Sequence, residues 1–450
     1  MPSPKHSHND RTNVPVIDQR GSQSLPNFPF NEEVQRLTRD GTPQRIVHGK
    51  GGGAFGVFEA NHDISDICKA KVFKKGTKTR VLVRFSIGCE GNGFPDTVRE
   101  ARGFAVKMYT EEGIWDFLGS SSPVFLIRSP ELFSSLAQAQ KRHPQTHGKD
   151  PNLFWNFVGN NPQTLHHILI VHSDRGMPDG FRHLNGYGSH TFKMVNDRNG
   201  FVWVKFHFRC DQNIRNLDPK TAGTIAGGQL HYAAADLYHA IATKNYPSWT
   251  LYLQVMTDEQ ARSVAFNPFD MTKIFPHKDF PLRKVGRLTL NENPTNYTSQ
   301  IEQAAFNPTH MPSGIEPSPD KILQLRLNSY TDAHRRRVGQ NDLSIPVNNP
   351  QTNHNFRGNS FHQSGFTQTI HGAFDASVFG NYMMLGEDDF SQPRDFYKRV
   401  LDQQGRANLI DNIAESLGQC TDRNIVHRIL VLLSHLDVDF GQKMAEKIRF

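Results

Sequence analysis

Between residues 80 and 291 the chain repeatedly alternates apolar and polar residues, which is the period-two pattern of half-buried β-strands. The pattern predicts strands at 80–88, 103–110, 122–128, 188–196, 201–209, 249–256 and 284–291. Asp197-Arg198-Asn199-Gly200 lies between two of them and is typical of a hairpin turn. So many antiparallel strands in one stretch of chain favour a β-barrel or a β-sandwich.

Helical spacing of apolar residues is found in other parts of the chain. Residues 229–243 predict a helical insertion among the strands, and an apolar stripe from Leu409 to Leu417 predicts a helix near the C-terminus. Thr421-Asp422 can cap a second helix there, whose stripe runs from Ile425 to Leu436. Residues 338–394 have few apolar runs and predict a long connector that wraps over the fold.

These patterns together predict an α+β protein with five parts. The parts are an N-terminal arm at 1–44, a β domain, barrel or sandwich, with a helical insertion at 45–300, a helical region at 301–337, a wrapping loop at 338–394 and a helical domain at 395–450.

Composition excludes several classes of protein. Hydrophobic residues at 36% and charged residues at 21% are typical of a globular chain, and no window has eighteen consecutive apolar residues, so we expect no membrane span. The net charge of +7 comes without a basic stripe, which argues against nucleic-acid binding. The four cysteines are isolated from one another, and the first thirty residues lack an apolar leader, so we expect an intracellular protein without structural zinc.

Two apparent motifs are interpreted as structural. Gly51–Gly56 satisfies the G-x-G-x-x-G dinucleotide pattern but lacks the preceding apolar strand and the later acidic residue of that site. His143 and His147 are four residues apart, but Pro144 between them disfavours the helix that a zinc site needs.

Arg326 and Tyr330 are the most informative pair. On a helix, residues four apart share a face, and a guanidinium beside a phenol stabilises the phenolate, a ligand suited to ferric iron. A surface helix with a buried tyrosine would give the same spacing. The 22 histidines and 32 phenylalanines fit an aromatic cofactor site, and they fit equally well a packed aromatic core.

Longer motifs carry a resemblance to a known family. They are Arg45-Ile46-Val47-His48-Gly49, Val83-Arg84-Phe85-Ser86, Ser173-Asp174-Arg175-Gly176, Asn185–Phe192, Tyr246-Pro247-Ser248-Trp249, Phe266–Asp270, Pro276–Asp279 and Gly314–Lys321. In this order and spacing they resemble the haem catalases, of the small-subunit type. The resemblance implies an eight-stranded antiparallel barrel with an arm, a wrapping loop and a C-terminal helical domain.

The resemblance also implies a site for haem b. Tyr330 would be the iron ligand and Arg326 would hold it as the phenolate. His48 would lie on the face of the haem opposite Tyr330 and shuttle the peroxide proton there, and Ser86 would orient the His48 ring. Further positions that the family places at the haem are the propionate partners Arg45, Arg84 and Arg337 and the packing residues Val47, Phe125 and Phe133. His190 also matches a family histidine, and no role is assigned to it.

The chain departs from the family near the haem. Ser120 replaces the asparagine that helps to bind peroxide, and a hydroxyl is shorter and offers one donor. Gly88 stands at the usual valine of the access channel, Glu100 at a channel aspartate, and Leu325 at the glycine before Arg326. Together these changes suggest a retuned pocket.

A second family site, which binds reduced nicotinamide nucleotide, also maps onto the chain. The matching residues are His166, Ser173, Arg175, Asn185, Arg209 and His277, with Phe275 at the usual tryptophan. The resemblance therefore implies NADPH or another small molecule at this place, unless the pocket persists only for packing.

We therefore expect a haem-dependent oxidoreductase that activates peroxide, dioxygen or superoxide. Ser120 favours oxidation or oxidative cyclisation of a small organic substrate in specialised metabolism, in the manner of chanoclavine synthase in ergot alkaloid formation. The alternative is an ordinary catalase that converts hydrogen peroxide to water and dioxygen, and a haem-binding sensor is a third interpretation. Most catalases are tetramers, so we expect a homo-oligomer, dimer or tetramer, in the cytoplasm or the peroxisome.

Overall fold

The computed structural model describes residues 28–39, 41–88, 91, 93–349 and 388–448. Met1–Pro43 is a compact unit of its own, in which helix α1 (Phe28–Arg39) is described. Gln44–Phe450 is the second compact unit and contains the rest of the described residues. Most of the predicted wrapping loop, residues 350–387, lies outside the described residues.

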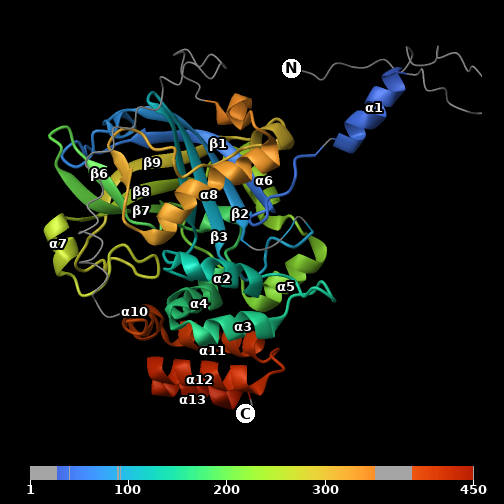
Figure 1. The fold of residues 1–450 in the computed structure, drawn as a ribbon, viewed down its shortest axis with the longest axis vertical. Coiled ribbons are helices and arrows are strands. Elements are labelled where there is room, and N and C mark those ends of the chain that lie inside the picture. The colour runs from blue at the N-terminus through green and yellow to red at the C-terminus, as the bar shows by residue number, and fades with distance from the viewer. Residues whose placement is uncertain (1–27, 40, 89–90, 92, 350–387, 449–450) are drawn as a thin grey trace, which may run out of the picture. The chain divides into compact units, whose positions relative to one another are not determined.

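The centre of this unit is a closed antiparallel barrel (Figure 1). Among the described residues, β1, β2, β3, β4, β5, β7, β8 and β9 pair in a circle that closes when β9 returns to β1. β6 and β10 extend the sheet beside β7. The bounds are β1 Gly51–Ala60, β2 Lys78–Ile87, β3 Arg102–Thr110, β4 Gly113–Ser120, β5 Gly186–Tyr187, β6 Phe192–Val195, β7 Phe201–Cys210, β8 Ser248–Met256, β9 Arg283–Glu292 and β10 Ile315–Pro317. The predicted α+β fold with an eight-stranded barrel is confirmed.

Aromatic side chains fill the barrel. Phe85 is fully buried and contacts the rings of Phe104, Phe181 and Trp249 at centroid distances of 5.2 to 5.6 Å. Phe104 continues the cluster to Phe208 at 5.5 Å. Much of the phenylalanine excess therefore serves packing, which was the simpler of the two interpretations of the composition.

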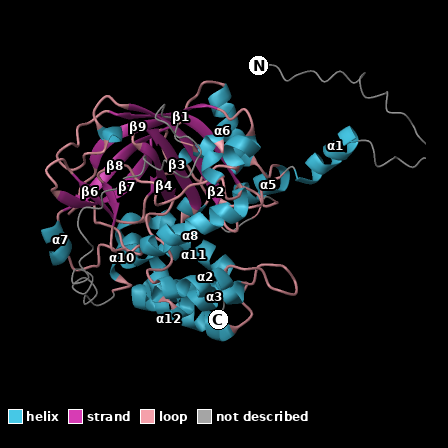
Figure 2. Ribbon diagram, turned by 45° about the horizontal axis from the view of Figure 1, so that its top comes forward, coloured by secondary structure: helices cyan, strands magenta, loops and turns pink. Residues whose placement is uncertain are grey.

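A layer of helices lies at one end of the barrel (Figure 2). α3 and α4, which precede six of the ten described strands in sequence, share one apolar core with the C-terminal helices. The helices of this layer are α2 Phe133–Ala139, α3 Pro151–Asn160, α4 Leu165–His172, α10 Ser391–Asp395, α11 Gln403–Leu417, α12 Arg423–Leu436 and α13 Val438–Ile448. The remaining helices are α5 Pro219–Gly228, α6 Tyr232–Ala242, α7 Asp258–Ser263 and α8 Lys321–Val338.

Several predicted elements are confirmed. The insertion at 229–243 contains α6, and the C-terminal stripes are α11 and α12. Asp422 caps α12, since its carboxylate accepts a hydrogen bond from the Asn424 amide at 2.9 Å. The predicted hairpin joins β6 to β7, with Asn199 in the left-handed region at φ 62°. None of the described helices is both long and apolar enough to cross a lipid bilayer.

One predicted strand is wrong, and four of the described strands were missed, namely β1, β4, β5 and β10. Residues 122–128 are irregular, because Pro123 cannot donate to a sheet and the Ser122 hydroxyl bonds the Val124 carbonyl at 2.8 Å. β1 was missed because its glycines interrupt the alternation of apolar and polar residues. A Cβ at Gly56 would lie 2.0 Å from the Thr289 carbonyl oxygen, so glycine lets β1 approach β9 closely. α4 was missed because nearly all its residues are buried, which leaves no polar face.

Candidate active site

Tyr330 and Arg326 lie on α8 as their spacing predicts. The Arg326 Nη2 donates to the Tyr330 hydroxyl at 2.8 Å, and the guanidinium carbon is 5.2 Å from the centre of the phenol ring. The other terminal nitrogen of Arg326 contacts the Nε2 of His190 at 2.7 Å, and the His190 Nδ1 lies 2.6 Å from a carboxylate oxygen of Asp320. Asp320, His190, Arg326 and Tyr330 therefore form a continuous hydrogen-bonded chain.

This chain fixes the proton positions on His190. Arginine can only donate, so the Nε2 of His190 accepts and its Nδ1 carries the proton that it donates to Asp320. Burial lowers the pKa of His190, and the nearby Asp320 carboxylate opposes that effect. A neutral imidazole leaves the charge of Arg326 free to stabilise a phenolate on Tyr330.

Asp320 has a second task, which explains why α8 begins there. Its Oδ1 accepts hydrogen bonds from the amides of Ile322 at 2.9 Å and Leu323 at 3.1 Å, so it is the N-cap of α8. Neither Asp320 nor a role for His190 was predicted from the sequence. The only signal was local: Asp320 follows Pro319 immediately before a helical run, as an N-cap does.

On the other side of the site, His48 lies over a row of residues from three neighbouring strands. Ser86 on β2 pairs with Gly103 on β3, and Gly103 pairs with Ser120 on β4, so the three share one face of the sheet. The Ser86 hydroxyl is 3.0 Å from the His48 Nδ1. The Ser120 Oγ accepts from the Ser122 amide at 3.2 Å, which leaves its own proton available for donation.

Electrostatics join this row to α8. Burial lowers the pKa of His48 to about 4, and the guanidiniums of Arg84, Arg326 and Arg45 lower it further in that order. His48 is therefore neutral at physiological pH and can accept a proton. Because the charge of Arg326 is among those that lower the pKa of His48, the His48 side and the Tyr330 side lie close enough to interact electrostatically.

The three predicted propionate partners also gather there. Arg45 donates to the Glu302 carboxylate at 2.9 Å and to the Ala304 carbonyl at 2.8 Å, and Arg337 donates to the same Ala304 carbonyl at 2.9 Å. Burial lowers the pKa of Arg84 to about 9, with the charge of Arg45 next in effect. Burial likewise lowers the pKa of Arg337 to about 10.

The predicted packing residues are more scattered. Val47 is 53% exposed and Phe133, at the start of α2, is 45% exposed. Phe125 packs into the helical core, with its ring 6.4 Å from that of His167. Within the described part of the chain, no aromatic contact or hydrogen bond joins Phe125 or Phe133 to His48, so their place beside a cofactor stays a prediction.

Comparison with known proteins agrees with this geometry. The catalase family model matches residues 4–381, and the model described as catalase-related immune-responsive matches residues 385–448. The chain belongs to the catalase family. Catalase of Glandirana rugosa is 47% identical over 431 residues, which cover 91% of this chain and 82% of that protein. Catalase of Cavia porcellus is 45% identical over 460 residues, covering 97% and 87%.

Solved structures give the same result for the fold. A crystal structure of a fungal catalase has a TM-score of 0.86 at 36% identity and covers 97% of this chain and 94% of its own. Catalase A from Saccharomyces cerevisiae also has a TM-score of 0.86 at 36% identity, covering 96% and 95%.

The catalase family implies haem, and the donor set of this chain fits it. Arg45, Arg84 and Arg337 bring three guanidiniums together. Arg45 donates to the Glu302 carboxylate and Arg337 to the Glu302 main-chain carbonyl, which leaves an excess of positive charge that suits two propionates. The buried Nε of Arg84 has no hydrogen-bond partner among the described residues. On α8, the phenol of Tyr330 is already bonded to a cation, as an anionic iron ligand requires.

The residues mapped to the nucleotide site lie in two groups. His166 and Arg175 approach the ring of Phe396, at 6.3 Å from ring to ring and 5.6 Å from guanidinium to ring. The Ser173 hydroxyl accepts from the Arg175 amide at 3.4 Å.

The second group lies at β5 and β7. Asn185 bonds the Tyr187 hydroxyl at 2.8 Å, and exposed His277 lies 6.0 Å from the ring of His207. Arg209 is exposed on β7, and burial followed by the charge of Arg209 lowers the pKa of His277. Phe275, at the usual tryptophan position, is fully buried against Phe280.

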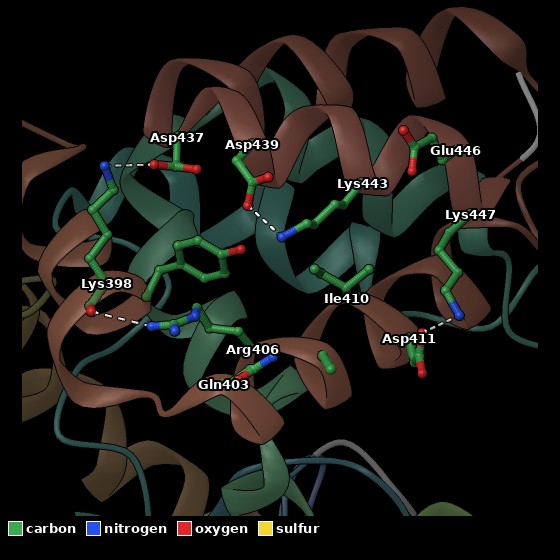
Figure 3. Close-up of a pocket in the computed structure, with 12 residues that line it drawn as sticks. Lys398, Gln403, Arg406, Ile410, Asp411, Asp437, Asp439, Lys443, Glu446 and Lys447 are labelled. Carbon is green, nitrogen blue, oxygen red and sulfur yellow. Dashed lines mark hydrogen bonds and ion pairs between the residues drawn. The ribbon is translucent and has the colours of Figure 1, made fainter.

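A separate hollow lies on the C-terminal helices (Figure 3). Its volume is about 920 Å³. Its charges are largely paired with each other, as in Lys398–Asp437, Lys443–Asp439 and Lys447–Asp411, each at 2.7 Å. Paired surface charges of this kind are typical of a solvated groove and give no reason to place chemistry there.

The two motifs interpreted as structural lie in a strand and in a turn of the described structure. Gly51–Gly56 lies in β1 and opens no helix. His143 and His147 form a turn closed by the bond from the His147 amide to the His143 carbonyl at 2.8 Å. No cluster of metal-binding side chains is found among the described residues.

Proposed function

We propose that this protein decomposes hydrogen peroxide to water and dioxygen with a haem held by Tyr330. The observation that carries the proposal is the joint arrangement of the Ser86–His48 pair and the Asp320–His190–Arg326–Tyr330 chain in one site. The high identity to proteins named catalase supports it and favours it over the expected oxidation of an alkaloid precursor.

Bound haem would supply a ferric iron that can store two oxidising equivalents, taken from one peroxide with release of water and passed to a second peroxide with release of dioxygen. The chain's own residues would do the rest. His48, neutral because of its lowered pKa, would take the proton from one peroxide oxygen and return it to the other, while Ser86 fixes the ring through Nδ1. Arg326 would keep Tyr330 anionic, and the Arg45, Arg84 and Arg337 cluster would bind the propionates.

A second candidate, oxidation of a small organic molecule, is favoured by Ser120. Its position in the row with Ser86 and Gly103 supports the inference that it faces the bound peroxide. A serine there holds peroxide with one short donor, so turnover of peroxide would be slower and another substrate would have more room.

Oxygen evolution from hydrogen peroxide by the haem-loaded protein tests the two candidates. We expect the wild type to evolve oxygen, and Ser120→Asn to evolve it faster by roughly two- to a hundredfold, because the amide adds a donor worth about 0.5–3 kcal/mol. The matched control is Ser135→Asn on the exposed face of α2, which should have no effect. Absence of oxygen from both wild type and Ser120→Asn at full haem occupancy would overturn the peroxide proposal and leave the organic substrate.

NADPH binding is proposed separately. Arg175, Arg209 and His277 are exposed cationic or titratable groups that suit phosphates, and the buried Nδ1 of His166 has no partner among the described residues. Titration calorimetry with NADPH should show binding that Arg209→Gln weakens, and absence of heat would contradict the assignment. The homo-oligomeric state and the cytoplasmic or peroxisomal location stay predictions.

A further inference from the structure

We propose that Lys205 is a positioning residue of the candidate site: it holds the turn before His190 and places a positive charge beside the Asp320–His190 pair. Lys205 would touch neither substrate nor iron, and would act on Tyr330 through His190 and Arg326. The inference rests on the proposed function, because it requires that Tyr330 bind haem iron. It starts from a strained turn in the main chain next to His190.

The chain makes a tight three-residue turn immediately before the His190 ring. The His190 amide donates to the Gly188 carbonyl at 2.6 Å, two residues back, and Ser189 between them has a φ of 57°. This left-handed conformation is unfavourable for a residue with a side chain, so the turn persists only where its surroundings hold it. Ser189 is buried, and its hydroxyl donates to the Ser122 carbonyl at 3.1 Å. The position of the His190 ring therefore depends on contacts that hold Ser189.

Lys205 on β7 supplies a contact to the main chain of this turn. Its Nζ donates to the Ser189 carbonyl, and this is the one hydrogen bond that Lys205 makes in the described part of the chain. The lysine is only 4% exposed, and no ion pair joins it to a carboxylate of the described residues. Burial of an ammonium without a partner carboxylate is unfavourable, so packing alone gives no reason for a lysine at this position.

An aromatic ring holds the ammonium in place. The Nζ of Lys205 lies 5.2 Å from the centre of the Phe275 ring, within the range of a cation–π interaction. Gln254 pairs with Lys205 across β7 and β8, and its Nε2 donates to the Phe275 carbonyl at 2.9 Å. Strand pairing therefore fixes both the lysine and the segment of the ring that it contacts, so the Nζ reaches Ser189 from a rigid base.

Charge connects Lys205 to the hydrogen-bonded chain of the site. Burial lowers the pKa of Lys205 to about 8, and the Asp320 carboxylate is the strongest of the charges that oppose this effect, so the ammonium stays mostly charged at pH 7. Burial also lowers the pKa of His190, and the charges of Arg326 and then Lys205 add to that effect. A cation here favours an anionic Asp320 and a neutral His190, the state in which the His190 Nε2 can accept from Arg326.

Removal of Lys205 should change the iron ligand in one direction. Without its hydrogen bond the turn at Ser189 can relax, which displaces His190 and loosens its hold on Arg326. Without its charge the region also becomes less positive. Both changes leave the oxygen of Tyr330 less stabilised, so the phenolate becomes a stronger donor to the iron. A stronger donor on one face of the haem weakens the binding of an anion on the other.

Cyanide binding to the haem-loaded ferric protein tests this without turnover. Lys205→Met keeps the length of the side chain and removes its charge and donors. It should raise the dissociation constant of cyanide about two- to tenfold, the range expected for one hydrogen bond, through a faster dissociation rate. Lys205→Arg keeps charge and donors and should bind cyanide more tightly than Lys205→Met. The control, Lys284→Met on the exposed face of β9, removes the same charge and should bind as the wild type does.

A thermal unfolding cycle tests the turn independently of haem. Glycine adopts a positive φ without strain, so Ser189→Gly should make the turn less dependent on Lys205. The change in melting temperature caused by Lys205→Met should therefore be more favourable, by about 1–3 °C, in the Ser189→Gly background than in Ser189→Ala. Alanine is the matched background, because it also lacks the hydroxyl but keeps the side-chain carbon. If Lys205→Met does not load haem, Lys205→Gln takes its place in both tests, with the same expected direction.

Two results would overturn the proposal. One is an unchanged dissociation constant of cyanide at full haem occupancy, and the other is an equal effect of the Lys205 substitution in the two Ser189 backgrounds. Neither measurement depends on oxygen evolution, so failure of the peroxide reaction and failure of this inference are distinguishable.

Discussion

Gly103 should be indispensable for the His48 side of the site, although it has no side chain to contribute. It lies between Ser86 and Ser120 in the row across β2, β3 and β4. A Cβ at Gly103 would lie 2.2 Å from the Ser86 Oγ and 2.9 Å from the His48 Nδ1. Gly103→Ala must therefore push apart the two atoms whose hydrogen bond orients the imidazole.

The expected losses of stability and of reaction rate in Gly103→Ala follow from these contacts. Inserting a methyl group into a packed site costs about 1–3 kcal/mol, and a lost Ser86–His48 hydrogen bond costs about 0.5–1.5 kcal/mol more. A misplaced general base loses much of a contribution that is typically about 10²–10⁴-fold in rate. We therefore expect Gly103→Ala to melt at a lower temperature and to react with peroxide at least about tenfold more slowly, with haem still bound.

Stopped-flow absorbance after mixing with peroxide, at matched haem occupancy, measures the rate. Gly223→Ala on α5 is the control, since a Cβ there meets nothing within 4 Å. Ser86→Ala combined with Gly103→Ala removes the closest collision, so the double variant should be less destabilised than the sum of the two single variants. A wild-type rate in Gly103→Ala, or strict additivity in the pair, would refute the steric argument.

Two further predictions concern the iron ligand and acid sensitivity. Tyr330→Phe should remove the phenolate-type haem spectrum, and an unchanged absorption spectrum would rule out Tyr330 as ligand, because phenylalanine has no oxygen. Burial lowers the pKa of His167 and His172 to about 4 and of His166 and His207 to about 3, so the unfolded chain binds more protons below pH 6.5. The free energy of unfolding should fall as pH drops from about 6.5 towards 4, by up to about 1.4 kcal/mol per pH unit for each group, and denaturant titrations with a constant midpoint across this range would contradict it.

Periodicity predicted those parts of the fold in which local pattern and tertiary burial agree. β7 and β8 alternate cleanly, and α12 has a polar face and an N-cap at Asp422. It failed where burial removed the contrast, as in α4, or where close strand approach demanded glycine, as in β1. The strand expected at 122–128 looked apolar enough, but Pro123 removed a donor that a sheet needs.

The residues of the candidate site also divide into those that could be predicted from the sequence and those that could not. Arg326 and Tyr330 could be paired from sequence because both lie on one helix, four residues apart. Asp320 and His190 could not, because 130 residues separate them. His190 precedes β6 and Asp320 follows β10, and these two strands pair only in the folded chain. The space for the His48 ring could not be predicted either. It exists because Gly103 has no side chain, and this matters only when β2, β3 and β4 pair in register.

The departures from the family fall unevenly on the two sides of the site. Leu325 precedes Arg326 on α8, yet Arg326 still bonds both Tyr330 and His190. The side that would control the electronic state of the iron therefore keeps its full hydrogen-bonded chain. Ser120 and Gly88 lie near His48, where peroxide would be bound, and Glu100 lies beside Gly88. If this protein differs from an ordinary catalase, the difference should thus appear in ligand access and proton transfer, and Tyr330 and Arg326 should give the same ligand field in either case.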